Sequence, residues 1–215
     1  MGYRHLTCAV VFPVVFFARS LYAQEPVTRH DPSLMEVHIA IDNREFCSGD
    51  NDVYTEKLNL TVRYTNKGKS TLTVFTGTDL PQGTIAAHTV EELKAGKYES
   101  ELGGALLPME GGRYMLGSDP ATERSITLTT GQSVEAKHYV GVVVSKSEST
   151  KVHGTIMSGK HFLKVFMAIK VSDGTINKVT ANSLSQHPEF RWVTVPSQPV
   201  EFEVPPTPDL KDCSN

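Results

Sequence analysis

The eight histidines are the residues in this sequence best suited to chemistry, because imidazole binds zinc and copper and exchanges protons near neutral pH. Four of them lie in the second half of the chain: His138, His153, His161 and His187. No two of these have the H-x-H or H-x-x-x-H spacing that would place two imidazoles on one face of a strand or helix. A metal-dependent enzyme would need folding to gather at least three of them with nearby carboxylates. We therefore expect no metal site and no cofactor.

Other patterns that carry chemistry are incomplete. Residues 48–52 (SGDND) hold two carboxylates two positions apart, but they lack the glycine and the distal glutamate of a full calcium loop. The chain has no G-x-S-x-G nucleophile elbow. Its glycine pairs at 103–104 and 111–112 lack the lysine and the helix of a phosphate-binding loop. The sequence therefore predicts a protein that is not an enzyme.

The N-terminus has the pattern of a secretory signal peptide. A short start carrying Arg4 precedes an apolar run at residues 6–18, and the segment ends in a small residue, Ala23. The run is too short to span a bilayer, which needs about 20 apolar residues. We expect residues 1–23 to be cleaved, with a cut after Ser20 or an uncleaved anchor as alternatives. The protein is then exported, to the periplasm or the exterior.

Export bears on the cysteines. Cys8 would leave with the signal peptide, so the exported chain would hold only Cys47 and Cys213. Two thiols in an oxidising compartment most often pair, and this pair would fasten the proline-rich tail to the first strand. Two unpaired or metal-binding thiols are the alternative.

Cleavage of the signal peptide would also change the net charge of the chain. Loss of two arginines with the signal peptide leaves 19 basic and 24 acidic side chains, a net charge of −5. Nucleic acids and anionic membranes select basic surfaces, so we expect neither as a partner. No later apolar run is long enough for stable membrane insertion.

Alternation of apolar and polar residues predicts the elements that would position any site. The clearest strand is 58–64 (LNLTVRY), with Leu58, Leu60, Val62 and Tyr64 on one face, and 161–171 (HFLKVFMAIKV) repeats the pattern. The other expected strands are 36–42, 71–75, 125–129, 133–144 with Gly141 as a bulge, 190–195 with Trp192 in the core, and 199–204.

Strands of this kind, separated by turns, predict one domain. We expect an all-β, antiparallel immunoglobulin-like β-sandwich of seven or more strands over residues 34–206. A flexible lead-in at 24–33 would precede it and a C-terminal tail at 207–215 would follow it.

A glycine-rich excursion from Gly77 to Thr122 interrupts the strands. Thr89 and Glu92 have capping-box spacing, which predicts one or two helical turns over 89–95. Tyrosine, methionine and leucine on loops at the end of a rigid sandwich are typical of recognition surfaces. We take these as candidate binding residues: Tyr98, Leu106, Leu107, Met109, Tyr114, Met115 and Leu116. The alternative is that they only cap the open end of the sandwich.

Three segments resemble exported bacterial immunoglobulin-like domains: LNLTVRYTNKGKSTLTVF, SITLTTGQSVEAKHYVGVVV and RWVTVPSQPVEFEV. The first has the strand, N-x-G turn, strand hairpin that these domains share with an intracellular proteinase-inhibitor family of similar fold. The resemblance implies a fold and transfers no functional residue. The export signal and the cysteine pair depart from the inhibitor family.

Three functions follow as hypotheses. The first is a non-enzymatic exported binding or adaptor module whose partner is another protein or an envelope component. The second is a proteinase inhibitor that presents the glycine-rich excursion to a protease. The third is a metal-dependent enzyme built on the histidines named above.

Overall fold

The structure is a computed structural model that describes residues 28–29, 34–49, 52–103, 125–151, 154–180 and 183–213. The predicted signal peptide at 1–23 lies outside these residues, as do most of the lead-in and the end of the tail. So do six of the candidate binding residues: Leu106, Leu107, Met109, Tyr114, Met115 and Leu116.

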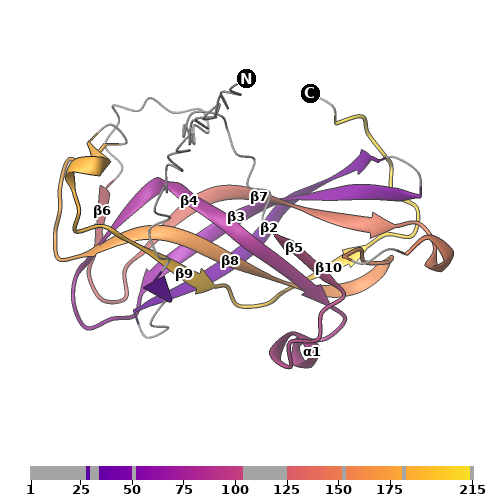
Figure 1. The fold of residues 1–215 in the computed structure, drawn as a ribbon, viewed down its shortest axis with the longest axis horizontal. Helices are drawn as coiled ribbons and strands as arrows, with labels where there is room; N and C mark the ends of the chain where they lie inside the picture. The colour runs from indigo at the N-terminus through magenta and orange to yellow at the C-terminus, as the bar shows by residue number, and fades with distance from the viewer. Residues whose placement is uncertain are drawn as a thin grey trace, which may run out of the picture.

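The described chain is almost entirely β-structure, arranged in two sheets (Figure 1). Its elements are β1 (Thr28–Arg29), β2 (Met35–Ser48), β3 (Val53–Asn66), β4 (Leu72–Ala87), α1 (Val90–Lys94), β5 (Ser100–Gly103), β6 (Ser125–Leu128), β7 (Ser133–Ser145), η1 (Glu148–Thr150), β8 (Gly159–Asp173), η2 (Leu184–Gln186), β9 (Arg191–Pro196) and β10 (Val200–Val204). Within the described ranges, no helix has the length and apolar character needed to cross a membrane.

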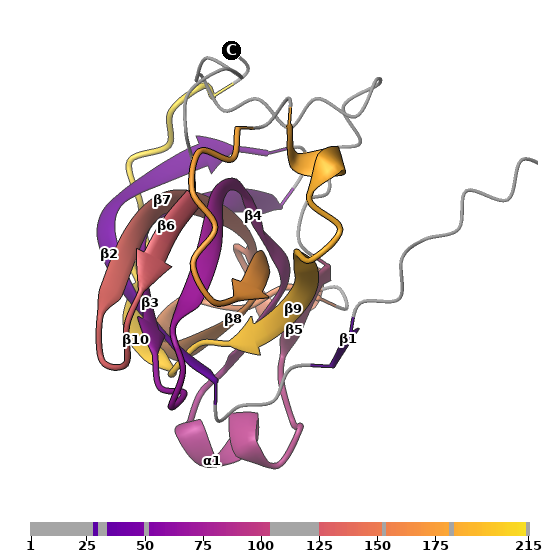
Figure 2. The same ribbon diagram turned by 90° about the vertical axis from the view of Figure 1, so that its left-hand side faces the viewer.

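The larger sheet has seven strands in the order β1-β9-β8-β4-β5, with β10 also paired to β8 and β6 to β4. The smaller sheet has the order β2-β3-β7. All pairings between named strands are antiparallel except that of the two-residue β1 with β9. The two sheets face each other, as Figure 2 shows, so the expected all-β antiparallel sandwich is confirmed.

The core lies between the sheets, and it is filled by the apolar side chains that the alternating patterns of the sequence placed on one face of each strand. Leu58, Leu60, Val62 and Tyr64 on β3 are all fully buried. The facing row on β8 is buried in the same way: Leu163, Val165, Met167, Ile169 and Val171. A side-chain period of two therefore delivers one apolar face from each central strand.

Two expectations about single residues are wrong. The β3–β7 register runs through Gly141 without a bulge, and a Cβ there would lie 3.3 Å from Cγ2 of Thr55, so the glycine leaves room for a neighbouring side chain. The register shift of the smaller sheet lies between Ile41 and Asn43 instead. Trp192 is only half-buried on the outer face of β9, where the Lys170 ammonium lies 5.2 Å from its ring centroid.

The excursion expected from Gly77 begins later than the sequence suggested. β4 continues to Ala87 and pairs with β8, and register shifts between Phe75 and Leu80 and between Pro81 and Gly83 absorb the irregular sequence. The predicted helical turns are confirmed as α1, with a complete capping box between Thr89 and Glu92. The chain then returns along β4 as β5.

The expected disulfide is present. Cys47 on β2 is bonded to Cys213, with Cα atoms 5.3 Å apart. Backbone hydrogen bonds run beside it, from Ser48 N to Lys211 O and from Lys211 N to Phe46 O, both 2.8 Å. The C-terminal tail is thus fastened to the edge of the smaller sheet.

Candidate metal-binding site

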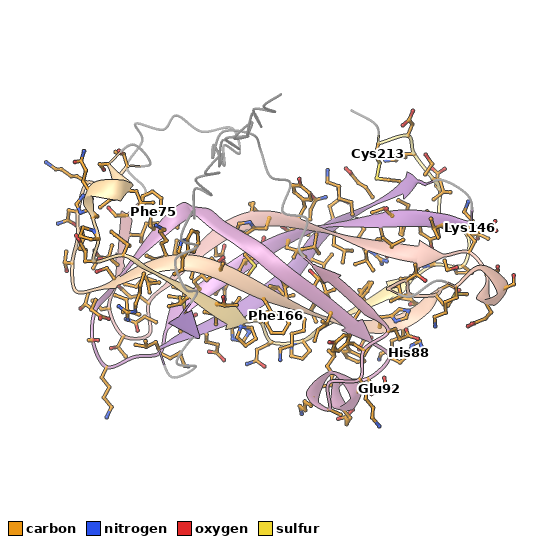
Figure 3. The ribbon with its side chains drawn as sticks, viewed as in Figure 1. Phe75, His88, Glu92, Lys146, Phe166 and Cys213 are labelled. Atoms are coloured by element: carbon orange, nitrogen blue, oxygen red, sulfur yellow. A yellow bond between two sulfur atoms is a disulfide. The ribbon has the colours of Figure 1, made fainter. Side chains whose placement is uncertain are left out.

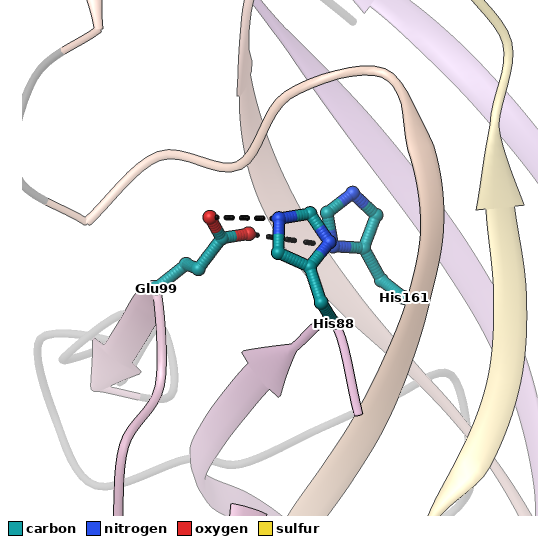
Figure 4. Close-up of side chains that lie close together, drawn as sticks. All are labelled: His88, Glu99 and His161. Carbon is teal, nitrogen blue, oxygen red and sulfur yellow. Dashed lines mark ion pairs between the residues drawn. The ribbon is translucent and has the colours of Figure 1, made fainter. Parts of the chain in front are cut away.

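Three side chains from separate segments converge at the end of the larger sheet: His88, Glu99 and His161 (Figure 4). One potential ligand atom from each lies within 4.8 Å of the other two. The side chain of His161 is fully buried, that of Glu99 is 20% exposed and that of His88 is 49% exposed. The group therefore runs from the core to the surface.

The connection from β4 to β5 positions two of the three. His88 directly follows the last residue of β4 and precedes Thr89, whose side chain caps α1, so Figure 3 shows it beside that helix. The chain then turns back, and the backbone N–H of Glu99 donates to the carbonyl of Ala86 at 2.9 Å. The Thr89 cap and the hydrogen bond from Glu99 to Ala86 therefore hold the backbone of His88 and Glu99 in a defined relative position.

His161 belongs to the inward-facing row of β8, as the first member before Leu163. Its ring stacks on that of His88, with centroids 4.7 Å apart and planes 25° apart. On the core side it lies against Phe202 of β10, with centroids 5.7 Å apart. The ring orientation is therefore held by packing on both sides.

The hydrogen bond of His161 determines which nitrogen holds its proton. Nε2 lies 2.8 Å from the carbonyl oxygen of Met157, and a carbonyl can only accept, so Nε2 carries the proton. In a neutral ring Nδ1 is then a lone pair. Burial lowers the pKa of His161, although the bond to Met157 opposes that shift, and the neutral ring is favoured.

The lone pair of His161 faces another acceptor. Nδ1 lies 3.5 Å from Oε2 of Glu99, and both atoms are buried without a hydrogen-bond partner among the described residues. Two acceptors facing each other at this distance repel unless a proton or a cation lies between them. Because a third potential ligand, His88, converges on the same two atoms, a metal ion is the candidate to test at this position.

His88 repeats the same arrangement nearer the surface. Its Nδ1 lies 3.3 Å from the carbonyl oxygen of Lys160 and its Nε2 lies 3.1 Å from Oε1 of Glu99. Metal-binding histidines usually donate their second N–H to a carbonyl or a carboxylate, which fixes the tautomer. Both histidines have such a carbonyl here, and in both the other nitrogen faces Glu99.

Lys151 completes the surroundings. Its ammonium lies 3.1 Å from Oε1 of Glu99, the oxygen that also faces His88. The lysine therefore compensates the carboxylate charge on one oxygen and leaves Oε2 to face His161. Without a metal, the competing arrangement is an ion pair between a protonated His88 and Glu99.

Of the four histidines considered from the sequence, the structure brings only His161 into this cluster. His138 is buried on β7 opposite Leu60, and His187 lies 2.9 Å from the carboxylate of Glu189. His153 lies outside the described residues. Of the histidines named for the metal-dependent hypothesis, His138 and His187 therefore lie outside the described cluster, and the structure does not test His153.

Two other residues named from the sequence, Tyr98 and Asp52, are described, and neither belongs to the cluster of His88, Glu99 and His161. Tyr98, the one candidate binding residue that is described, follows α1 and is 39% exposed. Asp50 of the acidic loop lies outside the described residues, and the backbone carbonyl of Asp52 accepts from Lys146 at 2.8 Å.

Sequence reasoning missed His88 and Glu99, because they lie in the stretch that was interpreted as an irregular excursion. One signal was available. The Thr89–Glu92 capping box marks His88 as the residue immediately before a helix, where a strand ends and the chain turns.

A fully buried carboxylate, that of Glu56, lies elsewhere and has a different environment. Glu56 on β3 is fully buried and accepts a hydrogen bond from Arg44 on β2, which also donates to the carbonyl of Glu203. Burial raises the pKa of Glu56, and Arg44 only partly opposes this. Since a guanidinium already occupies one side of Glu56, it is a structural ion pair and no part of a cation site.

Comparisons with known proteins identify no family. No family model matches the chain, and no curated protein matches it in sequence. An X-ray structure of a Northeast Structural Genomics Consortium target is 13% identical, over 86% of this chain and 97% of its own, with a TM-score of 0.37. A Bordetella pertussis protein with the provisional name ApaA is 11% identical, over 81% of this chain and 98% of its own, with a TM-score of 0.30. These scores carry no argument about function, and no relationship to a proteinase inhibitor is shown.

Proposed function

We propose that the protein is an exported, non-enzymatic binding module, and that the ligand at His88, Glu99 and His161 is a divalent transition-metal ion. One observation carries the proposal: the buried Nδ1 of His161 and the buried Oε2 of Glu99 face each other at 3.5 Å without another partner among the described residues. A cation between them satisfies both atoms at once.

The donor set favours a particular class of ion. Two imidazoles and one carboxylate are the ligands of many zinc sites and suit other borderline metals such as copper, nickel and iron. Calcium and magnesium prefer sites built from oxygen atoms. Zinc is therefore the ion to test first, and cobalt is its spectroscopic substitute.

Export and membership among exported immunoglobulin-like domains remain part of the proposal. The Cys47–Cys213 disulfide supports an oxidising compartment, because such bonds are rare where glutathione keeps thiols reduced. The two-sheet antiparallel sandwich supports the immunoglobulin-like architecture.

The experiment is isothermal titration calorimetry, in which Zn²⁺ is added to the purified, chelator-treated and disulfide-bonded protein. We expect one ion per chain. His88→Ala and Glu99→Gln each remove a ligand at the more exposed side of the site, so each should weaken binding by at least about tenfold. His161→Gln should do the same, but its ring is buried and its folding must be checked separately.

The matched control is His38→Ala. His38 on β2 is about as exposed as His88 and also pairs with a glutamate, Glu36, at 3.3 Å. No third metal ligand among the described residues converges on this pair. This variant should bind zinc like the wild type. Equal binding by wild type and His88→Ala would show that the cluster is only an ion pair between His88 and Glu99.

A further inference from the structure

Among the residues that the structure describes, the candidate site offers three protein ligands, which is fewer than a zinc ion accepts. Structural zinc sites close with four protein ligands, whereas three leave a position for an external ligand. The side chain of His88 is 49% exposed, so the remaining position lies toward solvent. An inference about the chemistry of that external ligand extends the proposed metal-binding function and rests on it.

Lys151 is the group placed to select the external ligand. The backbone N–H of Lys151 donates to the carbonyl of Glu148 at the end of η1, and its ammonium lies 3.1 Å from Oε1 of Glu99. An ammonium has three N–H donors, and one of them has a described acceptor, Glu99. The side chain is 31% exposed, so the other donors can reach a ligand that arrives from solvent.

The charge balance favours an anion. With both imidazoles neutral, a dication and the Lys151 ammonium face one carboxylate within the described part of the chain, that of Glu99. Lys160, which precedes His161 in the sequence, is already compensated, because its ammonium lies 2.7 Å from the carboxylate of Glu201. A bound ion is the largest local charge in such a site, so the metal-loaded site has an excess of positive charge.

We propose that the metal-loaded site binds a small oxyanion, a carboxylate or a phosphate, with one oxygen on the ion and another accepting a hydrogen bond from Lys151. Both chemistries present two oxygens in a geometry that bridges a metal and an ammonium. Lys151 is then the residue that selects anions over water or neutral ligands.

The test uses the purified protein loaded with Co²⁺, whose visible absorption reports changes in its ligands. Acetate and inorganic phosphate are added separately at constant ionic strength. We expect a saturable spectral change with at least one of them. Tighter binding of phosphate assigns a phosphoryl ligand, and tighter binding of acetate assigns a carboxylate ligand.

Lys151→Met should weaken anion binding by about tenfold or more, because a charge-assisted hydrogen bond is lost, while Co²⁺ still binds. Lys97→Met removes an exposed lysine two residues from Glu99 and is the matched control, with unchanged anion binding expected. If Co²⁺ binds but neither anion changes its spectrum, or if Lys151→Met binds anions like the wild type, the inference is overturned and the metal proposal stands. If the wild type gives no cobalt spectrum, both are overturned.

Discussion

Removing the Cys47–Cys213 disulfide should lower the free energy of unfolding substantially while leaving the folded structure in place. The bond joins residues 166 positions apart in sequence. In the chain-entropy model, a loop of this length restricts the unfolded chain by about 5 kcal/mol, and native disulfides of exported domains typically contribute about 2–5 kcal/mol. The tail keeps its two backbone hydrogen bonds to Phe46 and Ser48, so the loss should come mainly from the unfolded state.

The assay is urea unfolding of the wild type and of the double variant Cys47→Ser, Cys213→Ser, followed by circular dichroism. With a slope of about 2 kcal/mol per molar urea, a loss of about 4 kcal/mol moves the midpoint down by about 2 M. A reductant should lower the wild-type midpoint in the same way and leave the double variant unchanged. A double variant within about 0.5 kcal/mol of the wild type would refute the reasoning, since the loop would then add no constraint.

Three further predictions concern the core and the candidate site. Asn66→Ala should lower the free energy of unfolding, measured by urea denaturation, by about 2–3 kcal/mol. The buried amide of Asn66 donates to the carbonyls of Ser70 and Leu128 and accepts from the N–H of Gly68, all at 2.9 Å. A loss below about 0.5 kcal/mol would contradict this prediction. Because burial raises the pKa of Glu56, this residue holds its proton to a higher pH in the folded protein than in the unfolded chain, so its contribution to the free energy of unfolding falls as pH rises above about 4.5. Glu56→Gln should flatten that part of the stability profile measured by urea unfolding at several pH values. An unchanged slope would contradict this prediction. Zinc at 100 times its dissociation constant should raise the free energy of unfolding of the wild type by about 2.7 kcal/mol. The same zinc concentration should raise that of His88→Ala much less. Equal gains in the two proteins would show that the ion binds elsewhere.

The fold was largely predictable because its signal is local. Successive residues of β3 alternate between the core and the outer face, and those of β8 do so except at Ala168 and Ser172, which are also buried. A short window of sequence therefore predicts each strand and its buried side. Trp192 was misplaced for the same local reason. An aromatic residue suits either face of a strand, and the partner that covers its ring, Lys170, comes from β8.

The candidate site was not predictable in the same way, because its signal is not local. His88, Glu99 and His161 come from the end of β4, the approach to β5 and the start of β8, and only sheet pairing brings them together. Spacing rules for metal ligands detect pairs on one strand or helix, and no such pair occurs here. The decisive feature is Nδ1 of His161, which has no hydrogen-bond partner among the described residues. Its lone pair follows from the bond of Nε2 to a carbonyl in the loop before β8.

The most direct test of the central claim is a crystal structure of the zinc-soaked protein with anomalous diffraction data collected on both sides of the zinc absorption edge. We predict a single strong anomalous peak among Nε2 of His88, the carboxylate of Glu99 and Nδ1 of His161. The same crystals would show Nε2 of His161 still bonded to the carbonyl of Met157. A density map with no peak between these residues at saturating zinc, or with a peak only at another place on the chain, would contradict the account.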